Sequence, residues 1–225
     1  MNQPYQKSIN NLSPYEVSAL PILHKNLGQV MFNFFKKKQK NDLASNNNER
    51  SLVLSDDKLI PFEVYQVRIL YPQSWSVFII PNQEFTFSNG TVKIDHSLEG
   101  KLEKISLSLR WVQVDKDLNI DEYMEKLINQ FGRKQSKNKK DKYVINAVED
   151  IEGMQHKAKL LTSTITANHS VYRKFGKDET FRTFQINTIC PETNRLVIAS
   201  VTSDEETFEQ KKDFFYTILK SLRCH

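Results

Sequence analysis

The sequence predicts an α+β fold with a mostly antiparallel sheet and two main helices. In several short runs, separated by turn residues, apolar and polar side chains alternate, which is typical of antiparallel strands with one buried face. Apolar residues also recur at helical spacing in residues 120–131 and again near the C-terminus. The 225 residues are 39% hydrophobic and 26% charged. This composition is typical of a globular protein with a core, and it excludes collagen, coiled-coil and disulfide-scaffold classes.

The chain divides into two parts of different composition. Residues 1–54 are rich in Asn and Lys, and their few apolar residues follow no sustained period. We therefore expect a flexible, polar and basic N-terminal arm. Residues 55–225 contain the strand and helix patterns, with no internal repeat and no second boundary, so we expect a single globular domain there.

Short strands are expected to open this domain. Residues 65–71 place apolar side chains on one parity, Pro72 interrupts the pattern, and a new alternation begins at Trp75. The dipeptide Asn89-Gly90 lies between two apolar runs and favours a tight hairpin turn. The sequence thus predicts a strand over 65–71, another from residue 75, and a β-hairpin turn at Asn89-Gly90.

The clearest strand and the clearest helix follow each other. In residues 105–111, Ile, Leu and Trp alternate with Ser and Arg, which predicts a strand with one buried and one wet face. Residues 120–131 have helical periodicity, Asn119 is placed to cap the helix, and Gly132 is placed to end it.

The C-terminal part is expected to add strands and a final helix. Strands are predicted near residues 143–148, 155–166, 181–190 and 196–201. The final helix has the pattern of a capping box, Ser203 with Glu206, and its spacing places Phe208, Phe215 and Ile218 on the buried face.

Three segments resemble the Mog1/PsbP-like family. Residues 71–77 read YPQSWSV, similar to the early Y-P-x-G-W-x-V motif of that family, with Ser74 where the family often has glycine. Residues 151–158 read IEGMQHKA and look like its mid-chain I-x-G-x-x-A turn, and residues 215–222 are similar to its closing helix. The resemblance covers about residues 62–223.

The resemblance implies a fold and a class of function. Members fold as an α/β/α sandwich around a curved antiparallel sheet, so helices are expected on both faces. They include a nuclear-transport GTPase-binding protein, photosystem-associated lumenal proteins and bacterial proteins of unknown role. No shared set of catalytic residues carries over. The resemblance therefore implies a binding or accessory scaffold, not an enzyme.

Motifs for cofactors and metals are missing from the sequence. With only 6 Gly, it has neither a dinucleotide-binding nor a P-loop glycine pattern. Cys190 and Cys224 are expected to be too few and too far apart for a zinc site, and the histidines show no metal-ligand spacing. We expect no cofactor and no metal, with both cysteines as free thiols. Because no export signal or apolar spanning run is seen, we expect a cytoplasmic protein.

One acidic run needs a separate interpretation. Alternate side chains in residues 115–121 resemble the first half of an EF-hand loop. Ile120 stands where that loop needs glycine, and Lys126 replaces its final Glu. The pattern therefore favours a polar turn before a helix.

Two basic segments are the candidate partner-binding sites. The first carries six cations in ten residues: Arg133, Lys134, Lys137, Lys139, Lys140 and Lys142. The second joins aromatic and basic residues in the arm: Phe34, Phe35, Lys36, Lys37 and Lys38. Such charge predicts an acidic protein partner, while binding to nucleic acid or to an anionic membrane surface stays open as the alternative.

Overall fold

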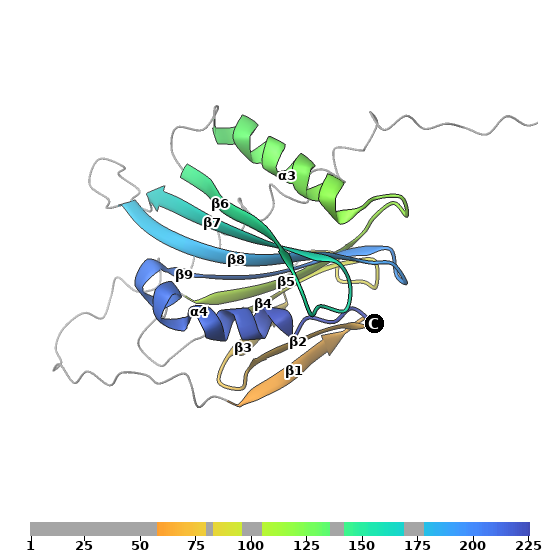
Figure 1. Cartoon of the computed structure of the whole chain (residues 1–225). Coiled ribbons are helices and arrows are strands. Elements are labelled where there is room, and N and C mark those ends of the chain that lie inside the picture. Colours follow the sequence, from red (N-terminus) through yellow and green to blue (C-terminus); the bar gives the residue numbers. More distant parts are fainter. Residues whose placement is uncertain (1–57, 80–82, 96–104, 136–141, 169–177) are drawn as a thin grey trace, which may run out of the picture. The chain divides into compact units, whose positions relative to one another are not determined.

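The computed structural model describes residues 58–79, 83–95, 105–135, 142–168 and 178–225 (Figure 1). Their elements, in chain order, are β1 (Leu59–Val64), β2 (Val67–Pro72), β3 (Ser76–Ile79), β4 (Asn89–Asp95), β5 (Ser106–Gln113), α3 (Ile120–Gln135), β6 (Lys142–Ile151), β7 (Ala158–Asn168), β8 (Asp178–Cys190), β9 (Arg195–Asp204) and α4 (Glu205–Lys220). The predicted N-terminal arm lies outside the described residues, so the boundary near residue 54 stays a prediction.

The described strands form a hairpin, β1-β2, and a seven-stranded sheet in the order β3-β4-β5-β9-β8-β7-β6. Every pair of neighbouring strands is antiparallel. Figure 1 shows α3 on one face of the sheet, and α4 with the β1-β2 hairpin on the other. The α+β class and the sandwich of helices around an antiparallel sheet are therefore confirmed.

The main core lies between the sheet and α4. Leu107, Leu109 and Trp111 alternate along β5 and are fully buried. Phe184 of β8 packs against Phe208 of α4, with ring centroids 4.5 Å apart. Full burial of one such side chain contributes about 1.5–3 kcal/mol. Alternation in the strands and helical spacing in α4 thus supply the two apolar surfaces that meet here.

The opposite face of the sheet is polar across five strands. Direct cross-strand pairing forms one row on this face, which consists of Asp95, Ser106, Thr202, Thr183 and Ser163. The Ser106 hydroxyl donates to Asp95 Oδ1 over 2.5 Å, and the hydroxyls of Thr183 and Thr202 lie 2.9 Å apart. Burial raises the pKa of Asp95.

This polar face differs from the sequence expectation. Ser106, Ser108 and Arg110 were predicted to face water, yet the two serines are half-buried and Arg110 is only 8% exposed. Alternation shows that the two faces of a strand differ, but it does not show whether the polar face is covered.

The first strands differ from the prediction in their bounds. Tyr65 and Gln66 have positive φ angles of 48° and 64° and form the turn between β1 and β2. This is the backbone of a tight hairpin turn. The predicted strand over 65–71 therefore starts two residues later, and β1, which precedes it, was missed.

The predicted hairpin turn at Asn89-Gly90 is wrong. Both residues lie in β4, where Gly90 pairs with Trp111. A Cβ atom on Gly90 would lie 2.2 Å from the Trp111 ring, so glycine is required here by close packing and not by a turn. The chain turns earlier, where the Thr86 N–H donates to the Asn89 carbonyl over 2.8 Å.

The helix ends were predicted in part. Asn119 caps α3 as expected, because its Oδ1 accepts the Glu122 N–H over 2.9 Å. The helix continues through Gly132 to Gln135, so Gly132 does not end it. In α4 the cap is Asp204, the last residue of β9, whose Oδ1 accepts the Thr207 N–H over 3.0 Å, so the cap lies one residue after the predicted Ser203.

Candidate functional site

The predicted basic segment connects α3 with β6. Lys142 is the first residue of β6 and its side chain is exposed. Arg133 and Lys134 belong to α3, although their side chains lie outside the described residues. The remaining predicted partner-binding residues also lie outside them: Lys137, Lys139, Lys140, Phe34, Phe35, Lys36, Lys37 and Lys38.

The strand register adds a second basic segment to this end of the sheet. Lys142 pairs with Thr166 near the end of β7, and Asn168 at that end pairs with Asp178 at the start of β8. Residues 136–141 and 169–177 are therefore joined to neighbouring positions of the sheet. Residues 169–177 read HSVYRKFGK, with three cations and no acidic residue. Sequence reasoning missed this second segment because only the register relates it to the first.

The acidic run before α3 does not form a calcium loop. The two carboxylate oxygens of Asp121 contact Lys157 Nζ over 2.6 Å and Lys159 Nζ over 2.8 Å. Lys159 also contacts Asp150 of β6 over 2.8 Å. These ion pairs lower the pKa of Asp121. The run is a polar turn into a helix, as expected, and its last carboxylate binds α3 to the sheet.

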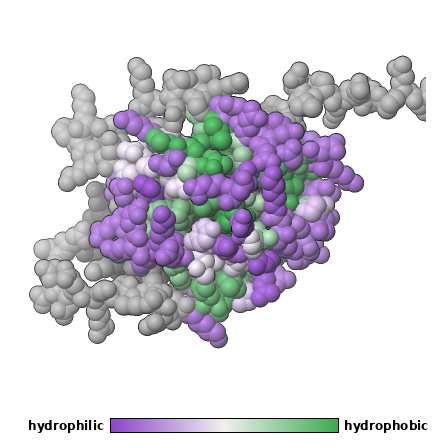
Figure 2. Space-filling view, viewed as in Figure 1, coloured by the Kyte–Doolittle hydropathy of each residue, from purple (hydrophilic) through white to green (hydrophobic). Residues whose placement is uncertain are grey.

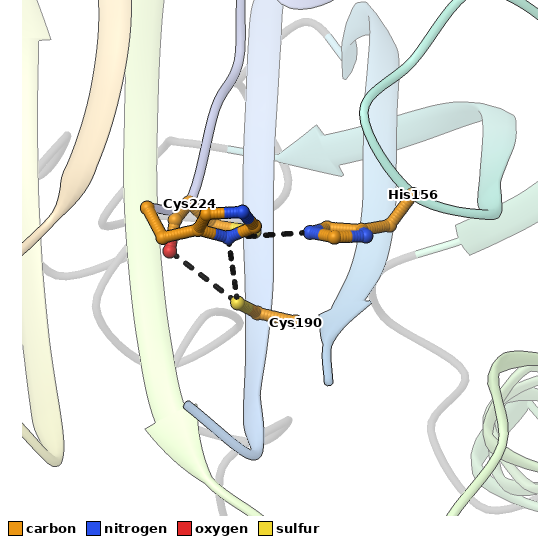
Figure 3. Close-up of side chains that lie close together, drawn as sticks. His156, Cys190 and Cys224 are labelled. Carbon is orange, nitrogen blue, oxygen red and sulfur yellow. Dashed lines mark hydrogen bonds between the residues drawn. The ribbon is translucent and has the colours of Figure 1, made fainter. Parts of the chain in front are cut away.

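A second site gathers cysteine and histidine side chains that are distant in sequence. His156, Cys190, Cys224 and His225, called here the Cys/His cluster, each place a ligand-type atom within 4.8 Å of the others. Figure 3 shows His156 pointing towards Cys190 and Cys224. Both cysteines are buried and both are free thiols.

Three separate segments position the Cys/His cluster. His156 lies in the turn between β6 and β7, and Cys190 is the last residue of β8. Cys224 and His225 follow α4. Arg223 and Arg68 of β2 exchange two backbone hydrogen bonds of 2.8 and 2.9 Å, which hold the C-terminal segment against the hairpin.

The contacts within the cluster are short and centre on one nitrogen. His225 Nδ1 lies 3.4 Å from His156 Nε2 and 3.5 Å from Cys190 Sγ. The Cys190 thiol donates to the Cys224 carbonyl over 3.4 Å. A carboxylate borders the same atoms, because Glu192 Oε2 lies 3.4 Å from each of these histidine nitrogens and 3.5 Å from Cys190 Sγ.

Burial favours the neutral form of two side chains in this cluster, His156 and Cys224. Burial lowers the pKa of His156, although Glu192 opposes the shift. Burial also raises the pKa of the Cys224 thiol, and the hydrogen bond with Cys190 raises it further. The fully buried Arg195, paired with Cys190 in the register, places a positive charge near both thiols.

The structure thus corrects one premise of the sequence analysis. Cys190 and Cys224 were considered too far apart to share a site, but the fold brings them together. Their residue numbers differ by 34, with β9 and α4 between them, and only the return of the C-terminal segment to the sheet places them side by side. In the sequence, the adjacency of Cys224 and His225 was the one available signal.

Comparisons with known proteins bear on the fold. No protein-family model matches the chain, and no curated protein matches it. Among solved structures, the chain is similar to that of cyanobacterial PsbP (CyanoP) from Synechocystis sp. PCC 6803, with a TM-score of 0.57 and 11% sequence identity. The match covers 80% of this chain and 98% of the cyanobacterial one. The chain has a PsbP-like fold. The sequence resemblance is thereby confirmed at the level of the fold.

Two further matches have lower scores. The Ran-binding protein Mog1p from Saccharomyces cerevisiae has a TM-score of 0.44 at 11% identity, covering 75% of this chain and 96% of that protein. A protein of unknown function from Pseudomonas aeruginosa, described as a putative regulator, has a TM-score of 0.38 at 11% identity, covering 72% of this chain and 94% of that protein.

Within the described residues, no helix has both the length and the apolar character needed to cross a membrane.

Proposed function

We propose that this protein is a non-enzymatic binding or accessory protein whose partner is an acidic protein. Two separate parts of the chain contact it: the end of the sheet where β6 begins, β7 ends and β8 begins, and the basic, aromatic segment of the N-terminal arm. One observation carries the proposal. The register joins two cationic segments, residues 136–141 and 169–177, to neighbouring positions of three adjacent strands.

Clustered cations favour binding over catalysis. Lysine and arginine side chains attract and orient a partner of opposite charge, and this raises the association rate. They supply neither a nucleophile nor a general base near neutral pH, because lysine and arginine side chains with ordinary pKa values stay protonated there. The PsbP-like fold supports a scaffold of this kind, since its rigid sheet fixes where the segments begin and end.

The test is a capture experiment with the full chain in native lysate, with and without nuclease. The test variant replaces Lys137, Lys139 and Lys140 with Gln. The matched control removes the same charge from exposed lysines elsewhere, with Lys58, Lys116 and Lys212 replaced by Gln. We expect a stoichiometric protein that stays bound after nuclease treatment and is released by salt. The test variant should capture less of it, and the control as much as the wild type.

Two other outcomes contradict the proposal. Loss of all captured material after nuclease would identify the basic segments as a nucleic-acid contact. Equal loss with the test and control variants would show that total charge, and not this end of the sheet, determines binding. A chain that begins at Ser55 separates the contribution of the arm, since it keeps both sheet segments and lacks the arm.

A further inference from the structure

We infer that the Cys/His cluster is a zinc site, in which His156, Cys190, Cys224 and His225 bind one ion in a closed, tetrahedral shell. The argument starts from ligand chemistry. Two thiols and two imidazoles are the donor set of structural zinc sites, and sulfur and nitrogen ligands together favour zinc over calcium or magnesium.

The distances fit such an ion. Zn–N bonds of about 2.0–2.1 Å and Zn–S bonds of about 2.3 Å place neighbouring tetrahedral ligand atoms about 3.3–3.8 Å apart. His225 Nδ1 lies 3.4 Å from His156 Nε2 and 3.5 Å from Cys190 Sγ, within that range. No pair of ligand atoms exceeds 4.8 Å, so the widest pair closes by about 1 Å on binding.

Surrounding residues support the ligands as outer partners do in zinc sites. The Gln155 side chain supports one C-terminal ligand, since its Oε1 accepts the Cys224 N–H over 3.3 Å. Glu192 is not such a partner, because its Oε2 lies 3.4 Å from the two histidine nitrogens that would bind the ion, so it moves aside when the ion binds. Arg195 stabilises the thiolates that must form, because its positive charge interacts with both cysteines and its Nη2 has no hydrogen-bond partner among the described residues.

Binding is an exchange of protons for metal. Each thiol, protonated in the free protein, releases its proton to solvent and forms a bond to zinc as thiolate, while each neutral imidazole donates a lone pair. The ion then links the β6-β7 turn, the end of β8 and the segment after α4. With four protein ligands no position is open for substrate, so the site is structural.

The test is metal binding by the reduced full chain after treatment with a chelator, using zinc and cobalt(II) as probes. We expect one equivalent of zinc, and a cobalt spectrum with the intense visible bands and thiolate charge-transfer absorption of a tetrahedral sulfur-ligated ion. Zinc at one hundred times its Kd should raise the thermal midpoint by about 5–10 °C.

Variants separate this site from adventitious binding. Cys190→Ser and Cys224→Ser should each weaken the cobalt charge-transfer bands, and the double variant should abolish them. His225→Ala, at an exposed position, should weaken zinc binding at least about tenfold without loss of folding. His169→Ala removes a histidine outside the cluster and should leave binding unchanged. Circular dichroism of each variant confirms that it is folded.

Two results would overturn the inference. One is a reduced wild-type protein that binds no more zinc than the variant lacking both cysteines. The other is a disulfide between Cys190 and Cys224 in protein purified without reductant, combined with no zinc binding after reduction. In that case the cluster would be a redox pair and not a metal site.

Discussion

At the scale of single residues, Gly90 and Trp111 determine how closely β4 and β5 pack on the α4 side of the sheet. Trp111 is fully buried, and its indole N–H donates to the Thr86 carbonyl over 2.8 Å. Its ring contacts Phe85 edge-on, with centroids 5.4 Å apart, and Tyr65 at 6.0 Å. The indole occupies the space in which any other residue at position 90 would place its Cβ.

Gly90→Ala should therefore destabilise the protein by about 1–3 kcal/mol, because the new methyl group must displace the indole and weaken its hydrogen bond. The free energy of unfolding in urea, followed by tryptophan fluorescence, measures this. Ser76→Ala, at an exposed position in β3, is the control and should change it by less than about 0.5 kcal/mol. Equal urea midpoints for Gly90→Ala and the wild type would contradict the packing argument.

At the scale of elements, α4 depends on its N-cap. Asp204 is the last residue of β9, and its side chain accepts both the Thr207 N–H, over 3.0 Å, and the Thr207 hydroxyl, over 2.9 Å. Asp204→Ala should cost about 1 kcal/mol of folding stability, and Asp204→Ser should recover most of it, since serine also caps helices. Chemical denaturation measures both variants. If Asp204→Ser is no more stable than Asp204→Ala, loss of the helix cap is not the reason for the lower stability of Asp204→Ala.

The contact between α3 and the sheet depends on pH through Asp121. Lys157 and Lys159 lower the pKa of this carboxyl, so its contribution to stability is present above the pKa of the unfolded chain, near 3.8, and is lost as the pH falls through the lower folded value. Asp121→Asn should be less stable than the wild type at pH 7 and equal to it near pH 2. Urea midpoints at both pH values test this, and 1 M salt at pH 7 should reduce the difference.

The elements show what a sequence reveals about this fold. Alternation in residues 105–111 and helical spacing in residues 120–131 are local patterns, and both elements were found where predicted. The Asn89-Gly90 turn was wrong because the reason for this glycine, the Trp111 ring, lies on another strand. The predicted cap of α4, Ser203, was one residue too early, because the end of β9 depends on its pairing with β8.

At the scale of the whole molecule, the candidate sites depend on the topology, because it brings together residues that are distant in sequence. The family resemblance predicted the sandwich, but nothing local to residue 156 or 190 indicates that both meet residues 224 and 225. Exposed apolar side chains are likewise spread over distant segments, including β3, where Phe78 is 44% exposed and Ile79 54%. Figure 2 shows hydrophobic residues on one face as separate patches among hydrophilic ones.

The last prediction concerns the two basic segments acting together. The ends of both segments are joined to neighbouring strand positions, so we expect their attraction for an acidic partner to combine. Replacing Lys137, Lys139 and Lys140 with Gln should lower the association rate with poly-L-glutamate several-fold. Adding the same change at Arg173, Lys174 and Lys177 should lower it further by a similar factor and flatten its dependence on salt.

Stopped-flow rates at ionic strengths from about 0.01 to 0.15 M measure this, because the screening length falls over that range from about 30 to 8 Å. The control with Lys58, Lys116 and Lys212 replaced by Gln removes the same charge as the first triple variant, from exposed positions in other elements. It should slow association at the lowest ionic strength, where distant charges still act, and match the wild type at 0.15 M. If the control is as slow as the test variant at 0.15 M, net charge explains the attraction, and the shared end of β6, β7 and β8 has no special role.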